Sequence, residues 1–129
     1  MRKNTSNQKT NNQKQSPVYI DIKAIIEAKG ITLNRNGEAV TFKNGYQVGC
    51  KKIKEINEKN TQSIIYNIKK ALRELRKGEF IGVWINEGIA YIDKSERVNT
   101  YKKAIKKGRK RGEQSVYEWA TGLCLPVNA

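Results

Sequence analysis

The clearest hydrophobic pattern in the chain lies between residues 61 and 77. Apolar side chains recur there at intervals of three and four residues, which places them on one face of a helix. The members of this series are Ile64, Ile68, Ala71, Leu72 and Leu75. Asn60 or Thr61 can cap the first turn, and Gly78 can end the last one. The pattern therefore predicts an amphipathic helix over residues 61–77.

A weaker pattern precedes it in residues 17–30. Its apolar residues occupy one helical face, Asp21 is suited to cap a helix, and Gly30 stands where a helix commonly ends in glycine. The same stretch alternates with period two over residues 18–22, which would permit a short strand instead. We favour a short helix over residues 21–29, preceded by extended chain.

Residues 31–49 alternate between apolar and polar positions around two Asn-Gly dipeptides. Asn-Gly is the strongest short-range signal for a hairpin turn. A two-residue loop at the first dipeptide places Leu33 opposite Val40. A three-residue loop at the second places Phe42 opposite Tyr46, and keeps the apolar residues together. We therefore expect a three-stranded meander with one apolar face.

A second hairpin is predicted in residues 80–93, turning at Asn86-Glu87-Gly88. We expect a three-residue loop there, which pairs Val83 with Tyr91. Both faces of the hairpin are then apolar, as in strands that are covered on both sides. The polar residues 50–60, with isolated isoleucines, are expected to connect the meander to the long helix through a loose helical turn.

The stretch from Tyr101 to Trp119 combines an apolar series with a dense run of basic residues. Six residues of this stretch fall within about 60° of one helical face. They are Tyr101, Ile105, Gly108, Gly112, Val116 and Trp119. We expect a helix that begins at Ser95 or Thr100, runs to about Ala120 and stops at Gly122. The final LCLPVNA can return to the sheet edge.

This order of elements predicts an α+β fold. We expect an antiparallel sheet of about five strands, the three-stranded meander plus the hairpin, packed by two main helices, with a short N-terminal helix. Residues 1–16 contain four cations, no acid and no large apolar residue after Met1, so we expect a disordered basic tail. This tail is either a solvated segment or an arm that tracks phosphates. Residues 17–129 are expected to form a single α+β domain.

The charge of the chain is strongly unbalanced. Its 129 residues include 26 Lys and Arg against 12 Asp and Glu, for a net charge of +14. Such self-repulsion is usually offset by an anionic partner, most commonly nucleic acid, otherwise an anionic membrane or an acidic protein surface. No apolar run approaches the roughly 20 residues needed to cross a bilayer, and no signal-peptide pattern is present. We therefore expect a cytoplasmic protein without a membrane partner.

The basic residues gather in two places. Between Lys102 and Arg111 the chain carries seven cations and no acid, and like charges four residues apart repel one another on a helix. We interpret this run as a phosphate-binding face in preference to a merely solvated one. The outer face of the 61–77 helix is the second basic group, and Tyr117 is the candidate for base stacking. The candidate binding residues are Lys102, Lys103, Lys106, Lys107, Arg109, Lys110, Arg111, Tyr117, Lys69, Lys70, Arg73 and Arg76.

Catalytic chemistry has little support in the sequence. The absence of histidine removes the commonest general base and zinc ligand. Glu87, Asp93 and Glu96 could in principle hold a metal for phosphodiester cleavage, but the predicted hairpin separates Glu87 from Asp93, and Asp93 and Glu96 more simply form the start of a helix. Cys50 lies beside lysines without a base to activate it, and we expect it to be a small apolar residue at a strand end. We expect no catalytic residue, no metal and no cofactor.

Two segments of the chain resemble a group of known proteins. They are Trp84–Ser95, WINEGIAYIDKS, and Ala104–Trp119, AIKKGRKRGEQSVYEW. The spacing of Gly, Gln and aromatic residues over roughly residues 80–121 resembles small accessory proteins of phages and mobile elements of low-GC Gram-positive bacteria, a group that includes anti-CRISPR proteins. The resemblance implies a small non-enzymatic protein of a bacterial host cell that acts on nucleoproteins. Many such inhibitors are acidic DNA mimics, whereas this chain is basic.

The sequence thus leads to two functional hypotheses. The first is a small basic protein that binds RNA or DNA, or a nucleoprotein complex, without catalysis. The alternative is an inhibitor of a host defence nuclease that binds the nuclease or its guide or target nucleic acid.

Overall fold

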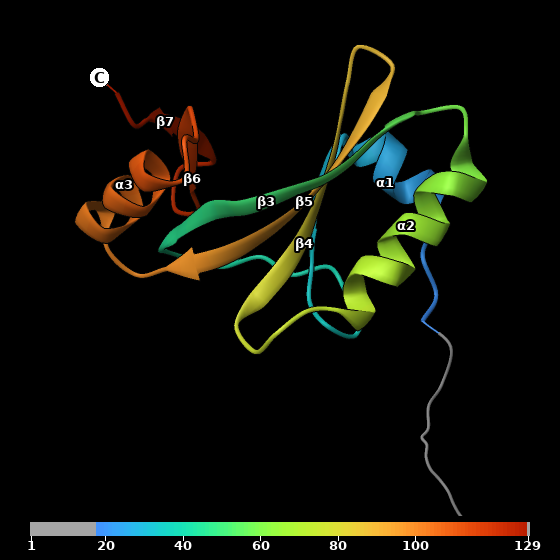
Figure 1. Ribbon diagram of the computed structural model, residues 1–129, viewed down its shortest axis with the longest axis horizontal. Coiled ribbons are helices and arrows are strands. Elements are labelled where there is room, and N and C mark those ends of the chain that lie inside the picture. Colours follow the sequence, from blue (N-terminus) through green and yellow to red (C-terminus); the bar gives the residue numbers. More distant parts are fainter. Residues whose placement is uncertain (1–17, 129) are drawn as a thin grey trace, which may run out of the picture.

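The computed structural model describes residues 18–128, which form an α+β fold of three helices and one sheet (Figure 1). In chain order the elements are α1 (Ile22–Ala28), β2 (Gly30–Leu33), β3 (Tyr46–Asn57), α2 (Thr61–Arg73), β4 (Glu79–Asn86), β5 (Ile89–Val98), α3 (Tyr101–Lys110), β6 (Ser115–Glu118) and β7 (Leu123–Pro126). The basic tail predicted for residues 1–16 lies outside the described residues.

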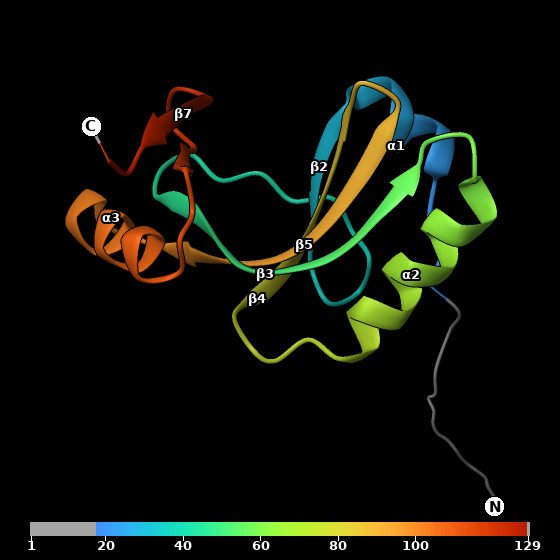
Figure 2. The same cartoon turned by 45° about the horizontal axis from the view of Figure 1, so that its top comes forward.

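The sheet has the order β2-β4-β5-β3-β6-β7, and every neighbouring pair is antiparallel. The predicted class of fold is therefore confirmed, but the sheet has six strands in the described residues where we expected about five. It is also strongly curled, so that β2 and β7 rise at its two ends on the side away from α2 and α3 (Figure 2).

The two faces of the sheet have different contents. Along β5, the buried Ala90, Ile92 and Val98 face the helices, while the intervening Asp93 and Ser95 face the inside of the curl. Side chains in a strand alternate between faces, which accounts for this division. The helix face carries two separate apolar cores. One lies under α1 and α2, and the other lies between α3 and the strands β3, β5 and β6. Thus α2 and α3 cover the same face at opposite ends (Figure 1).

The first two helices follow their sequence signals. The Asp21 side chain accepts a hydrogen bond from the Ala24 N–H, and the Asn60 side chain accepts one from the Ser63 N–H, which satisfies N–H groups that have no partner within each helix. The five apolar residues predicted for the inner face of α2 are all buried. This helix ends at Arg73, four residues before the predicted end. At the end of α1, Lys29 takes the left-handed conformation that we assigned to Gly30.

The three-stranded meander predicted for residues 31–49 is wrong. A turn forms at Asn36-Gly37, but its loop is one residue longer than predicted, so that Leu33 lies opposite Ala39 and not Val40. Within the described residues this contact is an isolated bridge and not a pair of strands. The chain then crosses the inside of the curl, where Phe42 packs edge-on against Phe80. The strand β2 pairs instead with β4, and Leu33 is buried there.

The loose connector predicted for residues 50–60 is also wrong. Residues 50–57 belong to β3, which pairs with β5 from Tyr46 to Asn57 through two register shifts, and only residues 58–60 form a turn before α2. The shifts bend the strand and allow its two halves to contribute to different cores. Because β6 pairs only with Tyr46 and Gln47, the remaining outer edge of β3 has no strand neighbour among residues 18–128. The exposed lysines at positions 51, 52 and 54 protect that edge against pairing with other chains.

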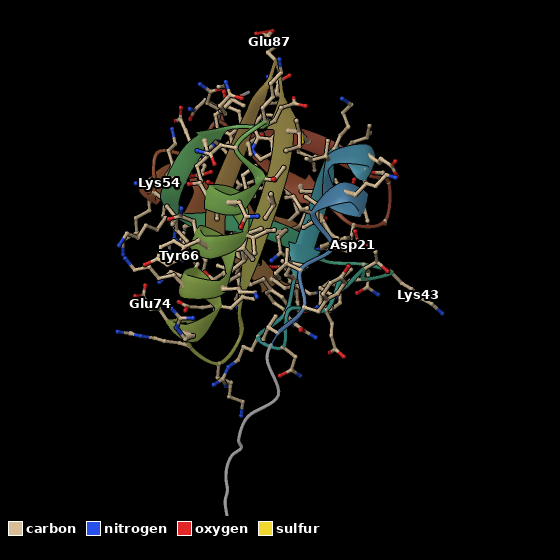
Figure 3. All side chains as sticks on the ribbon, turned by 90° about the vertical axis from the view of Figure 1, so that its right-hand side faces the viewer. Asp21, Lys43, Lys54, Tyr66, Glu74 and Glu87 are labelled. Atoms are coloured by element: carbon tan, nitrogen blue, oxygen red, sulfur yellow. The ribbon has the colours of Figure 1, made fainter. Side chains whose placement is uncertain are left out.

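The β4–β5 hairpin has a different register from the predicted one. Its loop has two residues, Glu87 and Gly88, whose φ angles are 50° and 80°. Glu87 lies at the tip of the molecule in Figure 3. Positive φ at both positions is typical of a type I′ turn, whose twist matches that of the strands. Val83 therefore lies opposite Ile92 instead of Tyr91. The shift moves Ile92 into the core and leaves Trp84 and Tyr91 together on the other face.

The last predicted helix is correct at its start and wrong at its end. The Thr100 hydroxyl caps α3 by accepting from the Lys103 N–H, which selects Thr100 over Ser95 as the start. The helix stops ten residues earlier than expected because Gly112 takes a φ of 73° and the Glu113 N–H donates to the Gly108 carbonyl. These features form a glycine-terminated Schellman cap. The residues beyond it form the β6–β7 hairpin, so the prediction that the final segment returns to the sheet edge is confirmed.

Gly108 allows α3 to lie against the C-terminal hairpin. An added Cβ would lie 2.8 Å from Val127 Cγ1 and 3.2 Å from Val116 Cγ1. We expect Gly108→Ala to lower the free energy of unfolding by about 1–2 kcal/mol, although alanine favours helices more than glycine does. Lys106→Ala, on the exposed face of the same helix, is the control and should change stability by less than about 0.5 kcal/mol. Denaturant unfolding of both variants measures the difference, and equal stabilities would contradict this close approach.

Candidate functional site

Four lysines of α3 form an exposed ridge, which we call the lysine ridge. Its members are Lys102, Lys103, Lys106 and Lys110. The opposite side of the helix buries Ala104, Ile105 and Gly108 against the second core. None of the four ammonium groups forms a salt bridge with an acid in residues 18–128. These four predicted binding residues are therefore brought together with their charges free.

The other three cations of the predicted run hold α3 in place. Lys107 Nζ lies 2.9 Å from Glu96 Oε1, and the Arg111 guanidinium donates to the same carboxylate oxygen. Arg111 also donates to the Gly49 carbonyl on β3. Arg109 Nε donates to the Val127 carbonyl at 2.8 Å. Of the seven cations, Glu96 therefore neutralises Lys107 and Arg111, and the four ridge lysines are free. Arg109 is anchored through Nε, but it is exposed and forms no salt bridge within residues 18–128.

Glu96 is the acid around which these contacts are arranged. It lies on β5, on the helix face of the sheet, and not at a helix start as predicted. Burial alone would raise the pKa of Glu96, but the hydrogen bonds from Lys107 and Arg111 outweigh burial and lower the pKa below its usual value of 4.5. Glu96 therefore remains ionised and links α3 to the sheet.

The second basic group lies at the other end of the molecule. Lys70 and Arg73 on α2, and Arg76 just beyond it, are exposed, while Lys69 is half-buried. Figure 3 views this end, with Tyr66 of the same helix on the surface. Because α2 and α3 cover opposite ends of the sheet (Figure 1), the two basic groups do not form one continuous helix face.

Tyr117 is not beside the lysines as predicted. It lies on β6 opposite Gln47, with its side chain on the inside of the curl, where it packs edge-on against Trp119 at a centroid distance of 5.0 Å. The prediction failed because it assumed that the helix continued past Gly112. The Lys-Arg-Gly-Glu sequence at that point carries the relevant signal, since basic residues followed by glycine are typical of a helix C-terminus.

The inside of the curl encloses a cavity that the sequence did not reveal, which we call the trough. Its volume is about 690 Å³, and residues from all six described strands and from the segment 39–41 line it. The buried Gln47 joins two of its walls. Gln47 Nε2 donates to Ser95 Oγ at 2.9 Å, and Trp119 Nε1 donates to Gln47 Oε1 at 3.0 Å. These bonds satisfy buried polar groups and hold the Trp119 ring in position.

The residues considered for catalysis are not brought together. Glu87 is at the tip of the hairpin (Figure 3), Asp93 faces the trough, and Glu96 faces the helices. No three Cys, Asp or Glu side chains in residues 18–128 are grouped as metal ligands. Cys50 lies within β3, and burial raises its pKa despite the nearby Arg111 guanidinium. A raised pKa disfavours the reactive thiolate, which agrees with the expected passive role.

We expect Glu96→Gln to lower the free energy of unfolding at pH 7 by about 1–2 kcal/mol, because two cations lose a charged partner. The pKa of Glu96 is lower in the folded than in the unfolded state, where it is near 4.5. The stabilisation that the ionised carboxylate gives to the folded state is therefore complete above pH 4.5, and it is lost as the pH falls through the folded-state pKa. The difference in free energy of unfolding between parent and variant should therefore become smaller as the pH is lowered from 6 to 3. Denaturant unfolding across this range measures it, and a gap independent of pH would contradict the assignment.

Comparisons with known proteins place no constraint on this site. No protein-family profile, curated protein sequence or solved structure matches the chain. Among the described helices, none has the length and apolar character required to cross a membrane. The expected resemblance to phage and mobile-element accessory proteins stays a prediction.

Proposed function

We propose that this chain binds nucleic acid through the lysine ridge of α3. The observation that carries the proposal is the group of four exposed ammonium groups on one helix face, none of them neutralised by an acid of residues 18–128. Like charges at this spacing destabilise a helix. Phosphate contacts would relieve the repulsion and release counterions from the nucleic acid, which is the main source of affinity in such complexes.

The dimensions of the ridge suit a phosphate backbone. With about 100° and 1.5 Å per residue, the four lysines occupy an arc of about 100° and a length of about 12 Å. Phosphates of one strand of a duplex advance by about 3.4 Å per step along the helix axis, so the ridge can contact roughly four of them. Lysine contacts of this kind position a protein on the phosphate backbone and carry no information on base sequence. The activity that we propose is binding without catalysis.

The division of the basic run sharpens the proposal. Lys107 and Arg111 are committed to Glu96, so these two support the ridge instead of adding phosphate contacts. Arg109 donates to Val127 through Nε alone, and its exposed guanidinium can still add one contact beside the ridge. The α2 cations are too far round the molecule to extend the same face (Figure 1). They form a separate surface that can make additional contacts with a long nucleic acid.

The test is a quadruple Lys→Gln variant at positions 102, 103, 106 and 110, measured with a duplex DNA, a duplex RNA and a single-stranded oligonucleotide. We expect affinity to fall about a hundredfold or more near 0.1 M salt. The slope of log K against log salt should become shallower by about 3 to 4 for duplex DNA, because four phosphate contacts are lost. Fluorescence anisotropy over a salt series measures both quantities.

The matched control removes the same charge elsewhere. Lys→Gln at the exposed positions 23, 29, 43 and 59 leaves the ridge intact and should change affinity and slope far less. The proposal is contradicted if both quadruple variants lose affinity equally, or if the ridge variant binds as tightly as the parent. Circular dichroism and thermal unfolding establish that each variant remains folded.

A further inference from the structure

The trough lies on the opposite face of the sheet from the proposed nucleic-acid surface. At about 690 Å³ it falls within the range of small-molecule sites. Gly82 and Trp84 of β4 form one side, and Tyr117 and Trp119 form the other. The segment before Gly45 crosses between the two sides (Figure 2), with Phe42 anchored edge-on against Trp119.

The charge of the trough is opposite to that of the protein. The chain has 26 Lys and Arg, about one residue in five, yet none lines the trough among the described residues. Its lining includes two acids, Asp93 from β5 and Glu113 from the turn that follows α3. With two carboxylates and no basic side chain among its described lining residues, the trough is complementary to a cation rather than to a phosphate.

The two carboxylates are not directly bonded to other side chains of residues 18–128, although Lys52 acts on Asp93 and Arg111 on Glu113 through their charges at longer range. Neither Asp93 nor Glu113 forms a side-chain hydrogen bond or a salt bridge within residues 18–128. The Glu113 carboxylate lies over Gly49, where an added Cβ would be 2.6 Å from Glu113 Oε1. Burial raises the pKa of Asp93, and the neighbouring charge of Glu113 raises it further against the opposing effect of Lys52. The two acids thus face the same space and repel each other.

The walls supply what an organic cation requires besides charge. Trp84 and Trp119, the two tryptophans of the chain, both line the trough together with Tyr117. Indole and phenol faces attract ammonium and guanidinium groups. Space is available next to Asp93, because Gly82 lies directly opposite it and an added Cβ there would meet no atom within 4 Å.

We propose that the trough binds a small organic cation that carries amine or guanidinium groups, with Asp93 and Glu113 as counter-charges and the tryptophan rings as walls. The bound cation relieves the repulsion between the two carboxylates. A ligand with two cationic groups joined by a short alkyl chain fits best, since the acids come from different elements. A free phosphate or a nucleobase-phosphate would meet two negative charges and no cation within the lining.

The experiment uses agmatine and spermidine as probes, with the full chain at low ionic strength. Both tryptophans line the trough, so their intrinsic fluorescence reports directly on its occupancy. We expect a saturable change in fluorescence with a 1:1 stoichiometry by calorimetry for at least one probe. Failure of both probes to bind overturns the proposal, as does tighter binding of a short single-stranded oligonucleotide that displaces them from the trough.

Three variants separate charge from volume. The D93N/E113Q variant should weaken probe binding about tenfold or more, because charged contacts are lost. Gly82→Val places a side chain in the free space opposite Asp93, and should also weaken binding although it changes no charge. The control E27Q/E74Q neutralises two exposed acids on α1 and at the end of α2, and should bind as the parent does. Equal affinities in all variants would overturn the proposal.

Stability distinguishes a ligand-binding role from a structural one. The pKa of Asp93 is higher in the folded than in the unfolded state. The folded state therefore loses stability as the pH rises from the unfolded-state pKa to the folded-state pKa of this carboxyl group. We therefore expect Asp93→Asn to be at least as stable as the parent at pH 7 while it loses probe affinity. A destabilised variant with unchanged affinity would show that Asp93 is structural.

Discussion

The pairing of β3 with β5 is the interaction on which the rest of the structure depends. It extends from Tyr46 opposite Val98 to Asn57 opposite Ile89, and it reaches both apolar cores. The two register shifts within it bend the sheet, so that one face carries the helices of residues 18–128 in two groups and the other forms the trough. Without this pair, α2 and α3 would have no common support, because their cores share no residue.

The curl also separates the charges of the molecule. On the helix side, Glu96 binds Lys107 and Arg111 and leaves the lysine ridge free on the outer surface. On the inner side, Asp93 and Glu113 face a cavity whose described lining has no cation. Asp93 and Glu96 are only three residues apart on β5, yet they have opposite pKa shifts because they point to opposite faces. The two proposed binding functions are therefore independent and can be abolished separately.

Several features were predictable because their causes are local. The caps at Asp21, Asn60 and Thr100 act within one helical turn, and the buried face of α2 follows from spacing within thirteen residues. The basic run was visible in the same way. Its division into free and neutralised cations was not predictable, since Glu96 on a neighbouring strand selects Lys107 and Arg111 as the two that are neutralised. The position of Tyr117 also has a local cause, because the glycine cap at Gly112 ends α3 before the chain reaches Tyr117.

The sequence by itself determined the class of fold, the positions of the first two helices and the strong positive charge, because these depend on composition and on contacts between near neighbours. Only the tertiary structure decided which strands pair, where the chain leaves the sheet near Phe42, and that a cavity lies inside the curl. Strand partners are distant in sequence, and a change of one residue in the hairpin loop moves every side chain to the other face. That choice placed Asp93 on the same face as Trp84, opposite the helices, where both line the trough.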